Sequence, residues 1–283
     1  MSLTTFESKT IIVRGGGDLA TGVVQRFFRA GFNVLILETA HPTAIRRSVA
    51  LCEAVYDGTA KVEDVECRKI SSLAEAQSCR QEGVVPVYID PTGSAIAEIK
   101  PSAVIDAIVA KRNLGTSKNM ADITIALGPG FIAGEDVHAV IETKRGHDLG
   151  KMILHGSAQP NTGVPGEMAG ESTRRVIYAP ADGIIKHNKE IGSIVEQGDV
   201  LLTVKSEKYR STEPHTTEVT APMSGLLRGL IREGIKVNKG MKVADIDPRN
   251  DIDWRTISDK ARCIGGAALE AYLYLKARRI NNE

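Results

Sequence analysis

The chain is poor in aromatic residues and in net charge, and each shortage excludes a class of protein. Phe, Trp and Tyr make up only 4% of its 283 residues, which argues against a surface that stacks nucleic acid bases. The 36 basic and 35 acidic side chains leave a net charge of +1, so no overall field attracts nucleic acid or a membrane surface. We therefore expect neither a nucleic acid nor a membrane as a partner.

Long apolar runs and cysteine pairs are also missing. No run reaches the roughly 18 apolar residues of a transmembrane helix, and the first residues lack the apolar core of a signal peptide. The four cysteines contain no C-x-x-C pair, so reduced thiols are the simplest interpretation. Together these features predict a cytoplasmic protein.

A glycine-rich turn follows the first apolar segment of the chain. The run Ile11 to Val13 is typical of a buried strand, and a predicted helix begins at Asp18. The glycines between them have the G-x-G-x-x-G/A spacing of a nucleotide-phosphate site, and Glu38 ends a second apolar run, where it could accept hydrogen bonds from ribose. A glycine turn that only packs tightly is the alternative. The predicted binding residues of this segment are Arg14, Gly15, Gly16, Gly17, Asp18, Ala20, Thr21 and Glu38.

Two further segments follow predicted strands. Lys111, Arg112 and Asn113 come directly after the apolar run 104–109, and Gly128 and Gly130 flank a proline after the run 123–127. The carboxyl ends of parallel strands are where doubly wound folds bind ligands, and a glycine turn can offer N–H groups to an anion. We predict that these residues and the first glycine turn form one site for a phosphorylated small molecule. A solvated loop is the alternative for residues 111–113.

Metal and catalytic motifs are not recognisable. Asp136, His138 and Glu142 share one face of a predicted strand, and His147 lies just beyond it. Such side chains can bind zinc, but their spacing fits no standard ligand set, so we predict no metal. The chain has no G-x-S-x-G, no Walker lysine loop and no H-E-x-x-H. No catalytic residue can be named, and whether the protein is an enzyme stays open.

Residues 179–204 recur as residues 221–246, with alanine, proline and glycine at matching places. Short β segments repeated twice cannot each bury a core, so the two copies must interlock. The pattern resembles the barrel-sandwich hybrid of biotinyl and lipoyl carrier domains. That resemblance puts the attachment lysine at Lys208, but no methionine flanks this lysine, so we expect no biotin or lipoate there.

These segments predict an α/β fold. A Rossmann-like parallel-sheet domain spans residues 1–175, because strand-like and helix-like segments alternate there. An inserted barrel-sandwich hybrid β-domain spans residues 176–248. A C-terminal helix lies within residues 249–283 and packs back on the α/β domain, where Gly265 and Gly266 would permit close packing against the sheet.

Four of the longer segments occur together in one known family. They are I-I-V-R-G-G-G-D-L-A-T-G at residues 11–22, A-K-R-N-L-G-T at 110–116, G-S-A-Q-P-N-T-G-V-P-G-E at 156–167 and L-R-G-L-I-R-E-G at 227–234. With these segments the chain resembles the accessory proteins of selenium-dependent molybdenum hydroxylases, which are related to xanthine dehydrogenase accessory factors.

The resemblance implies a maturation factor. Such a protein would bind the molybdenum cofactor (molybdopterin) or a nucleotide and deliver it to a client hydroxylase, with selenium or sulfur handled on the way; a homo-oligomer is compatible with this role. Two alternatives stay open. An NAD(P)-dependent oxidoreductase is supported by Glu38, and a biotinyl or lipoyl carrier rests on Lys208 alone.

Overall fold

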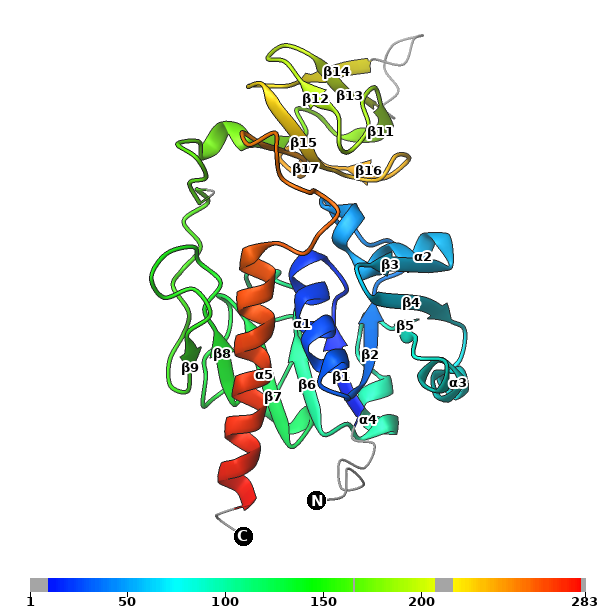
Figure 1. Ribbon diagram of the computed structural model, residues 1–283, viewed down its shortest axis with the longest axis vertical. Coiled ribbons are helices and arrows are strands. Elements are labelled where there is room, and N and C mark those ends of the chain that lie inside the picture. The colour runs from blue at the N-terminus through cyan, green and yellow to red at the C-terminus, as the bar shows by residue number, and fades with distance from the viewer. Residues whose placement is uncertain (1–9, 165, 207–215, 281–283) are drawn as a thin grey trace. The chain divides into compact units, whose positions relative to one another are not determined.

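The structure is a computed structural model that describes residues 10–164, 166–206 and 216–280 (Figure 1). The chain divides into two compact units. The first unit comprises Met1–Pro42, Val49–Thr162 and Ile257–Glu283, and the second comprises Thr43–Ser48 and Gly163–Thr256. Neither unit is continuous in sequence, because a short segment near residue 45 belongs to the second unit and the last helix belongs to the first.

One nine-stranded sheet forms the centre of the first unit, in the order β3-β4-β5-β2-β1-β6-β7-β8-β9. Neighbours from β4 to β8 are parallel, whereas β3 and β9 at the two edges pair antiparallel with the strands beside them. The strands are β1 (Thr10–Arg14), β2 (Asn33–Glu38), β3 (Thr59–Val62), β4 (Val65–Ile70), β5 (Val85–Ile89), β6 (Ala103–Asp106), β7 (Ile123–Leu127), β8 (Ala139–Ile141) and β9 (Met152–Ile153).

Helices cover both faces of this sheet, which is why its central strands are mostly apolar. The long helices α1 (Asp18–Arg29) and α5 (Asp259–Ile280) lie side by side on one face (Figure 1), and α3 (Ala76–Gln81) and α4 (Ala95–Ile99) contribute to the core on the other. The remaining short helices are α2 (Ala54–Asp57) and the 3-10 turns Arg47–Val49, Leu51–Glu53, Leu73–Glu75, Lys118–Met120 and Thr173–Arg175.

Glycines bring α1 and α5 into close contact. A methyl group on Gly22 would overlap the carbonyl oxygen of Ala261, and one on Gly265 would overlap the carbonyl oxygen of Gly22. Gly266, by contrast, has no atom within 4 Å of the place where a methyl group would lie. The glycine pair was predicted to pack on the sheet; only Gly265 makes a close contact, and it does so with a neighbouring helix.

Two four-stranded antiparallel sheets form the second unit, in the orders β10-β17-β15-β12 and β14-β13-β11-β16. Each copy of the sequence repeat gives one short strand to the other copy, because β11 pairs with β16 and β12 pairs with β15. The copies therefore interlock, as the repeat predicts. The strands are β10 (Val176–Tyr178), β11 (Gly183–His187), β12 (Ile194–Val195), β13 (Val200–Lys205), β14 (Thr216–Thr220), β15 (Gly225–Leu230), β16 (Lys236–Val237) and β17 (Lys242–Asp247).

The predicted fold class, a Rossmann-like parallel sheet with an inserted barrel-sandwich hybrid, is wrong. The protein is a mixed α/β structure that combines one large, mostly parallel sheet with two antiparallel sheets. Hairpin-like connections at β3–β4 and β8–β9 reverse the strand direction at both edges of the large sheet. The second unit is not a simple insertion either, since Thr43–Ser48 is part of it. Among the described helices, none is long and apolar enough to cross a bilayer.

Candidate functional site

The strand order of the large sheet reverses beside β1. From β1 the chain adds β2 on one side, and after β5 it returns to add β6 on the other side. In register, Arg14 at the end of β1 pairs with Leu37 of β2 and with Asp106 of β6. Open α/β sheets bind ligands outside the carboxyl ends of their strands at such a reversal. We call the three segments at this edge, residues 15–18, 107–116 and 127–131, the switch-point site.

The glycines after β1 have different structural roles. Gly15 has a φ of +92°, and a methyl group there would lie 3.1 Å from Ala107 O and from Ile108 N. Gly16 would similarly meet Cys52 N at 3.0 Å. Gly17, the residue before α1, has an ordinary φ of −68° and no atom within 4 Å of its would-be methyl group. Open space therefore lies beside the amino end of the helix.

Glu38 already accepts a hydrogen bond from the glycine turn. Its Oε2 accepts the N–H of Gly16 at 2.7 Å, and its Oε1 accepts the N–H of Thr39 at 2.7 Å. Burial raises the pKa of Glu38, although both N–H groups act to lower it. The Glu38 carboxylate was predicted to accept hydrogen bonds from a ribose. It instead accepts the N–H of Gly16, a group that could otherwise donate to a phosphate oxygen.

The loop after β6 is strained and carries two cations. Val109 and Lys111 have φ angles of 57° and 62°; this left-handed conformation is unfavourable for any side chain and especially for a β-branched one. Strain of this kind persists where the surrounding structure imposes it, often at ligand sites. Lys111 and Arg112 are exposed, and neither forms an ion pair with a residue that the structure describes.

A buried network holds this loop against β1. Thr116 Oγ1 donates to Asp106 Oδ2 at 2.6 Å and accepts a hydrogen bond from Arg14, whose side chain is 2% exposed. Asn113 closes the loop, because its Oδ1 accepts the N–H groups of Gly115 and Thr116, each at 2.8 Å. Burial raises the pKa of Asp106 despite the nearby Thr116 hydroxyl and Arg14. Arg14 and Asn113 therefore position the loop, whereas Lys111 and Arg112 stay open to solvent.

The turn after β7 joins the same assembly. Gly130 has a φ of +111°, and a methyl group there would lie 2.6 Å from Arg112 N. Gly128 has a φ of +75°, and a methyl group there would lie 2.5 Å from Thr143 Oγ1. The three segments predicted to form one site are thus in contact through the 107–116 loop.

Two other predicted residues and the nearest thiol have structural roles. Ala20 is 1% exposed. Thr21 Oγ1 donates to Gly17 O at 3.0 Å and accepts the N–H of Leu51 at 3.0 Å. These bonds connect α1 to the 3-10 turn Leu51–Glu53. Cys52 is buried, and burial together with the charge of Glu38 raises the pKa of its thiol far above the usual range. Cys52 is therefore no thiolate nucleophile at neutral pH.

The residues weighed as metal ligands do not converge. Asp136 Oδ2 accepts the N–H of Ile132, Glu142 accepts the N–H groups of Lys144 and Gln159, and His138 Nδ1 faces Thr124. No three His, Cys, Asp or Glu side chains of the described residues, His147 included, form a group that could hold a metal ion. Lys208 lies outside the described residues, so the expectation of no biotin or lipoate there stays a prediction.

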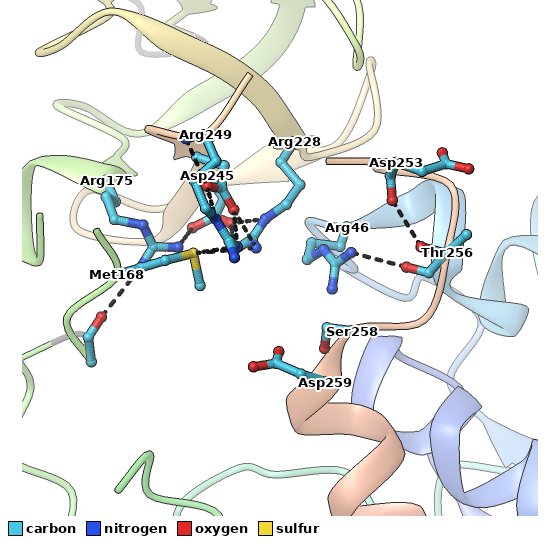
Figure 2. Close-up of polar contacts among 12 residues, drawn as sticks. Arg46, Met168, Arg175, Arg228, Asp245, Arg249, Asp253, Thr256, Ser258 and Asp259 are labelled. Atoms are coloured by element: carbon cyan, nitrogen blue, oxygen red, sulfur yellow. Dashed lines mark hydrogen bonds and ion pairs between the residues drawn. The ribbon is translucent and has the colours of Figure 1, made fainter. Parts of the chain in front are cut away.

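Sequence reasoning missed a buried ion network in the second unit (Figure 2). Arg228 Nε donates to Asp245 Oδ2 at 2.9 Å, and its Nη1 donates to Asp247 Oδ2 at 2.8 Å. Arg175 and Arg249 approach the same carboxylates, at 3.6 Å from Asp245 and 3.0 Å from Asp247. The missed signal was two aspartates at alternate positions of an otherwise apolar strand, which places both on one face of β17.

The electrostatics of this network favour charged carboxylates. The exposed fractions are 8% for Arg228, 3% for Asp245 and 0% for Asp247. Burial acts to raise the pKa of Asp245, but Lys242, Arg228 and Arg175 together lower it. Removing one partner of such a buried pair leaves an uncompensated charge.

Comparison with known proteins finds a relative that matches most of this chain. No family model matches the chain. It is 49% identical over 266 residues to the uncharacterized protein YqeB of Escherichia coli K12, a match that covers 94% of this chain and 47% of YqeB. The chain thus spans about half the length of the curated relative that it matches.

Solved structures resemble the chain only weakly. They include the product-bound ectoine utilization protein EutE (DoeB) of Ruegeria pomeroyi, at 12% identity and a TM-score of 0.27, covering 84% of this chain and 85% of that one. An aspartoacylase family protein of Mesorhizobium loti has 13% identity and a TM-score of 0.29, with 85% of each chain covered. A likeness at this level carries no argument about the fold or activity of this chain.

These findings contradict the predicted family and the role drawn from it. The relative is an uncharacterized protein, and the similar solved structures named here are proteins of the desuccinylase and aspartoacylase type, not molybdenum hydroxylase accessory proteins. The maturation role, the hydroxylase client, and the handling of molybdenum cofactor, selenium or sulfur are therefore withdrawn. The alternatives of an NAD(P)-dependent oxidoreductase and of a carrier protein find no support either. The resemblance had rested on short glycine-rich loop segments, and such segments recur in unrelated proteins because they serve local turns.

Proposed function

We propose that the first unit binds a nucleotide or a similar phosphorylated small molecule at the switch-point site. One observation carries the proposal: Gly15 contacts Ile108 and Gly130 contacts Arg112, so three loops adjoin at the carboxyl edge where the strand order reverses. The ligand class follows from the glycine turn that leads into α1, since phosphates bind at the amino ends of helices. The four free thiols support a reducing compartment, and we propose the cytoplasm.

The charges around the site suit an anion with several negative groups. The amino end of α1 carries a partial positive charge, and open space lies beside it at Gly17. Lys111 and Arg112 add two full charges that no described acidic side chain neutralises. Arginine suits a phosphate especially well, because its planar guanidinium can donate two parallel hydrogen bonds.

Lys111→Ala combined with Arg112→Ala tests the proposal. With both cations removed, we expect the affinity for ATP, measured by isothermal titration calorimetry on the full chain, to fall about tenfold or more. The matched control is Lys61→Ala combined with Lys151→Ala, which removes two lysines that are each 63% exposed and lie elsewhere in the same unit. If the two double variants lost the same ATP affinity, the loss would come from overall charge and not from a contact with Lys111 or Arg112.

A second variant separates a lost ligand contact from lost folding. Gly17→Val places its side chain in open space, so the chain should keep its fold while the ligand is blocked. If Gly17→Val bound ATP as tightly as the parent chain, or if the parent chain bound neither ATP nor pyrophosphate below about 1 mM, the proposal would be wrong.

Glu38→Gln distinguishes two roles for that carboxylate. If Glu38 stands in for a phosphate at Gly16 N, removing its charge should raise the affinity for pyrophosphate about fivefold, the effect of about 1 kcal/mol of relieved repulsion. If it accepts hydrogen bonds from a ribose, the affinity for ATP should fall and that for pyrophosphate should not change. Given the contacts with Gly16 and Thr39, we expect the first result. Parallel titrations of both ligands provide the measurement.

A further inference from the structure

A cavity lies in the first unit at the amino edge of the large sheet, opposite the edge that carries the switch-point site. It has a volume of about 620 Å³ and is lined by the segments that lead into β6, β7 and β8, together with the last turn of α5. The switch-point site lies at the carboxyl ends of these parallel strands, so the two places are separated by the length of the sheet. Nothing proposed above uses this cavity.

Positive charge dominates the lining of the cavity. Lys100, Lys118 and Arg279 line it together with a single acidic residue, Asp122. Arg279 Nη1 lies 3.2 Å from Asp122 Oδ1, but the two side chains are 48% and 72% exposed, and such a surface pair is weak enough to exchange partners. Lys100 forms no ion pair with any residue in the described part of the chain.

Two of the lining residues, Lys118 and Lys100, are held in place by the fold. Lys118 Nζ donates to the backbone oxygen of Gly134 at 2.8 Å, which fixes the ammonium group while leaving its charge unneutralised. Lys100 ends α4 with a φ of 50°, a left-handed conformation that is uncommon for lysine. The fold therefore sets the side chain of Lys118 and the backbone of Lys100.

His138 adds a neutral hydrogen-bond donor. Its Nδ1 accepts the backbone N–H of Thr124 at 3.0 Å, so the ring proton of the neutral imidazole is on Nε2. Burial, with smaller contributions from Lys118 and Arg279, lowers the pKa of His138 to about 4, although Asp122 acts to raise it. At neutral pH the residue is thus an uncharged donor beside three cations.

We propose that this cavity binds a small oxyanion with two negative charges, such as a phosphate monoester. Three cations and one carboxylate leave a charge of two to be balanced, and ammonium, guanidinium and imidazole N–H groups are all donors to phosphate oxygens. The cavity is large enough for a small metabolite. This site is independent of the ligand proposed for the switch-point site.

The imidazole of His138 gives a local readout. We propose long-range ¹H–¹⁵N spectra of the full chain during titration with inorganic phosphate, with potassium chloride adjusted to keep the ionic strength constant. The expected result is a saturable shift of the His138 signals with a dissociation constant in the millimolar range. A bound dianion should also raise the pKa of His138, because it offsets the charges of Lys118 and Arg279.

Variants decide whether the cations form the site. Lys118→Ala and Lys100→Ala should each weaken phosphate binding about fivefold or more, whereas Lys151→Ala, which removes a distant surface lysine, should leave it unchanged. The proposal is overturned if phosphate and chloride shift His138 equally, or if both cavity variants bind phosphate like the parent chain. Because the readout is His138, neither result depends on whether nucleotide binds near Lys111.

Discussion

Replacing Arg228 with alanine is expected to destabilise the second unit by about 3–5 kcal/mol, the usual cost of removing one partner from a buried ion pair. Arg228 bridges Asp245 and Asp247, and all three side chains are nearly inaccessible to water. Without the guanidinium, the cations left beside Asp245 among the described residues are Arg175 and Lys242, at 3.6 Å and 3.4 Å. Denaturant unfolding followed by the fluorescence of Trp254, the single tryptophan of the chain, reports on this unit.

The matched control for Arg228→Ala is Arg174→Ala. Arg174 is 55% exposed and pairs with Glu171 on the surface of the same unit, so its loss should cost no more than about 1 kcal/mol. If the two variants unfolded at the same denaturant concentration, the buried network would contribute no more than a surface pair. The measurement belongs at neutral pH, where Asp245, whose pKa is lowered in the folded state, is fully charged.

The neighbouring glycines of α5 should respond to alanine in opposite ways. Gly265→Ala is expected to destabilise the first unit by about 1–3 kcal/mol, because its methyl group would overlap the backbone of Gly22 in α1. Gly266→Ala is expected to stabilise the unit by about 0.5–1 kcal/mol, because alanine lowers the entropy cost of a helical position that has free space around it.

Helix content measured by circular dichroism during denaturation tests this glycine pair. The substitutions are at adjacent positions, so charge and composition are identical between the two variants. A gain of stability in Gly265→Ala would contradict the close contact between α1 and α5, and a loss of stability in Gly266→Ala would contradict the free space around that position.

Much of the first unit could be predicted from local patterns. The buried run Ile11 to Val13, the helix from Asp18 and the C-terminal helix predicted within residues 249–283 are present as β1, α1 and α5. Such elements follow from hydrophobic periodicity and from capping residues, which act over a few neighbours. The pattern also placed Lys111 and Gly130 in loops that follow strands, but β6 ends at Asp106 and not at Val109 as predicted.

The predictions that were wrong or missed concern residues whose contacts are distant in the sequence. Arg14 was expected to face a ligand, but Thr116 and Asp106 surround it. Gly265 was expected to meet the sheet and instead meets Gly22. A periodic pattern shows which face of an element is buried, and it does not show which element covers that face. The ion network around Arg228 was missed for the same reason, since its members come together only after β15 and β17 pair.

The segment Thr43–Ser48 constrains the order in which the protein can mature on the ribosome. Leu230 N donates to Ile45 O at 2.8 Å, and Arg47 Nε donates to Leu230 O at 2.7 Å, a pairing of residues 183 positions apart. The first unit in turn needs α5, which follows the second unit in the chain. Domains usually fold as units during synthesis, amino-terminal ones first. Here the second unit needs residues from Thr43 to Thr256, and the first unit also needs α5 beyond them, so the first unit cannot complete its folding before the whole second unit has been synthesised.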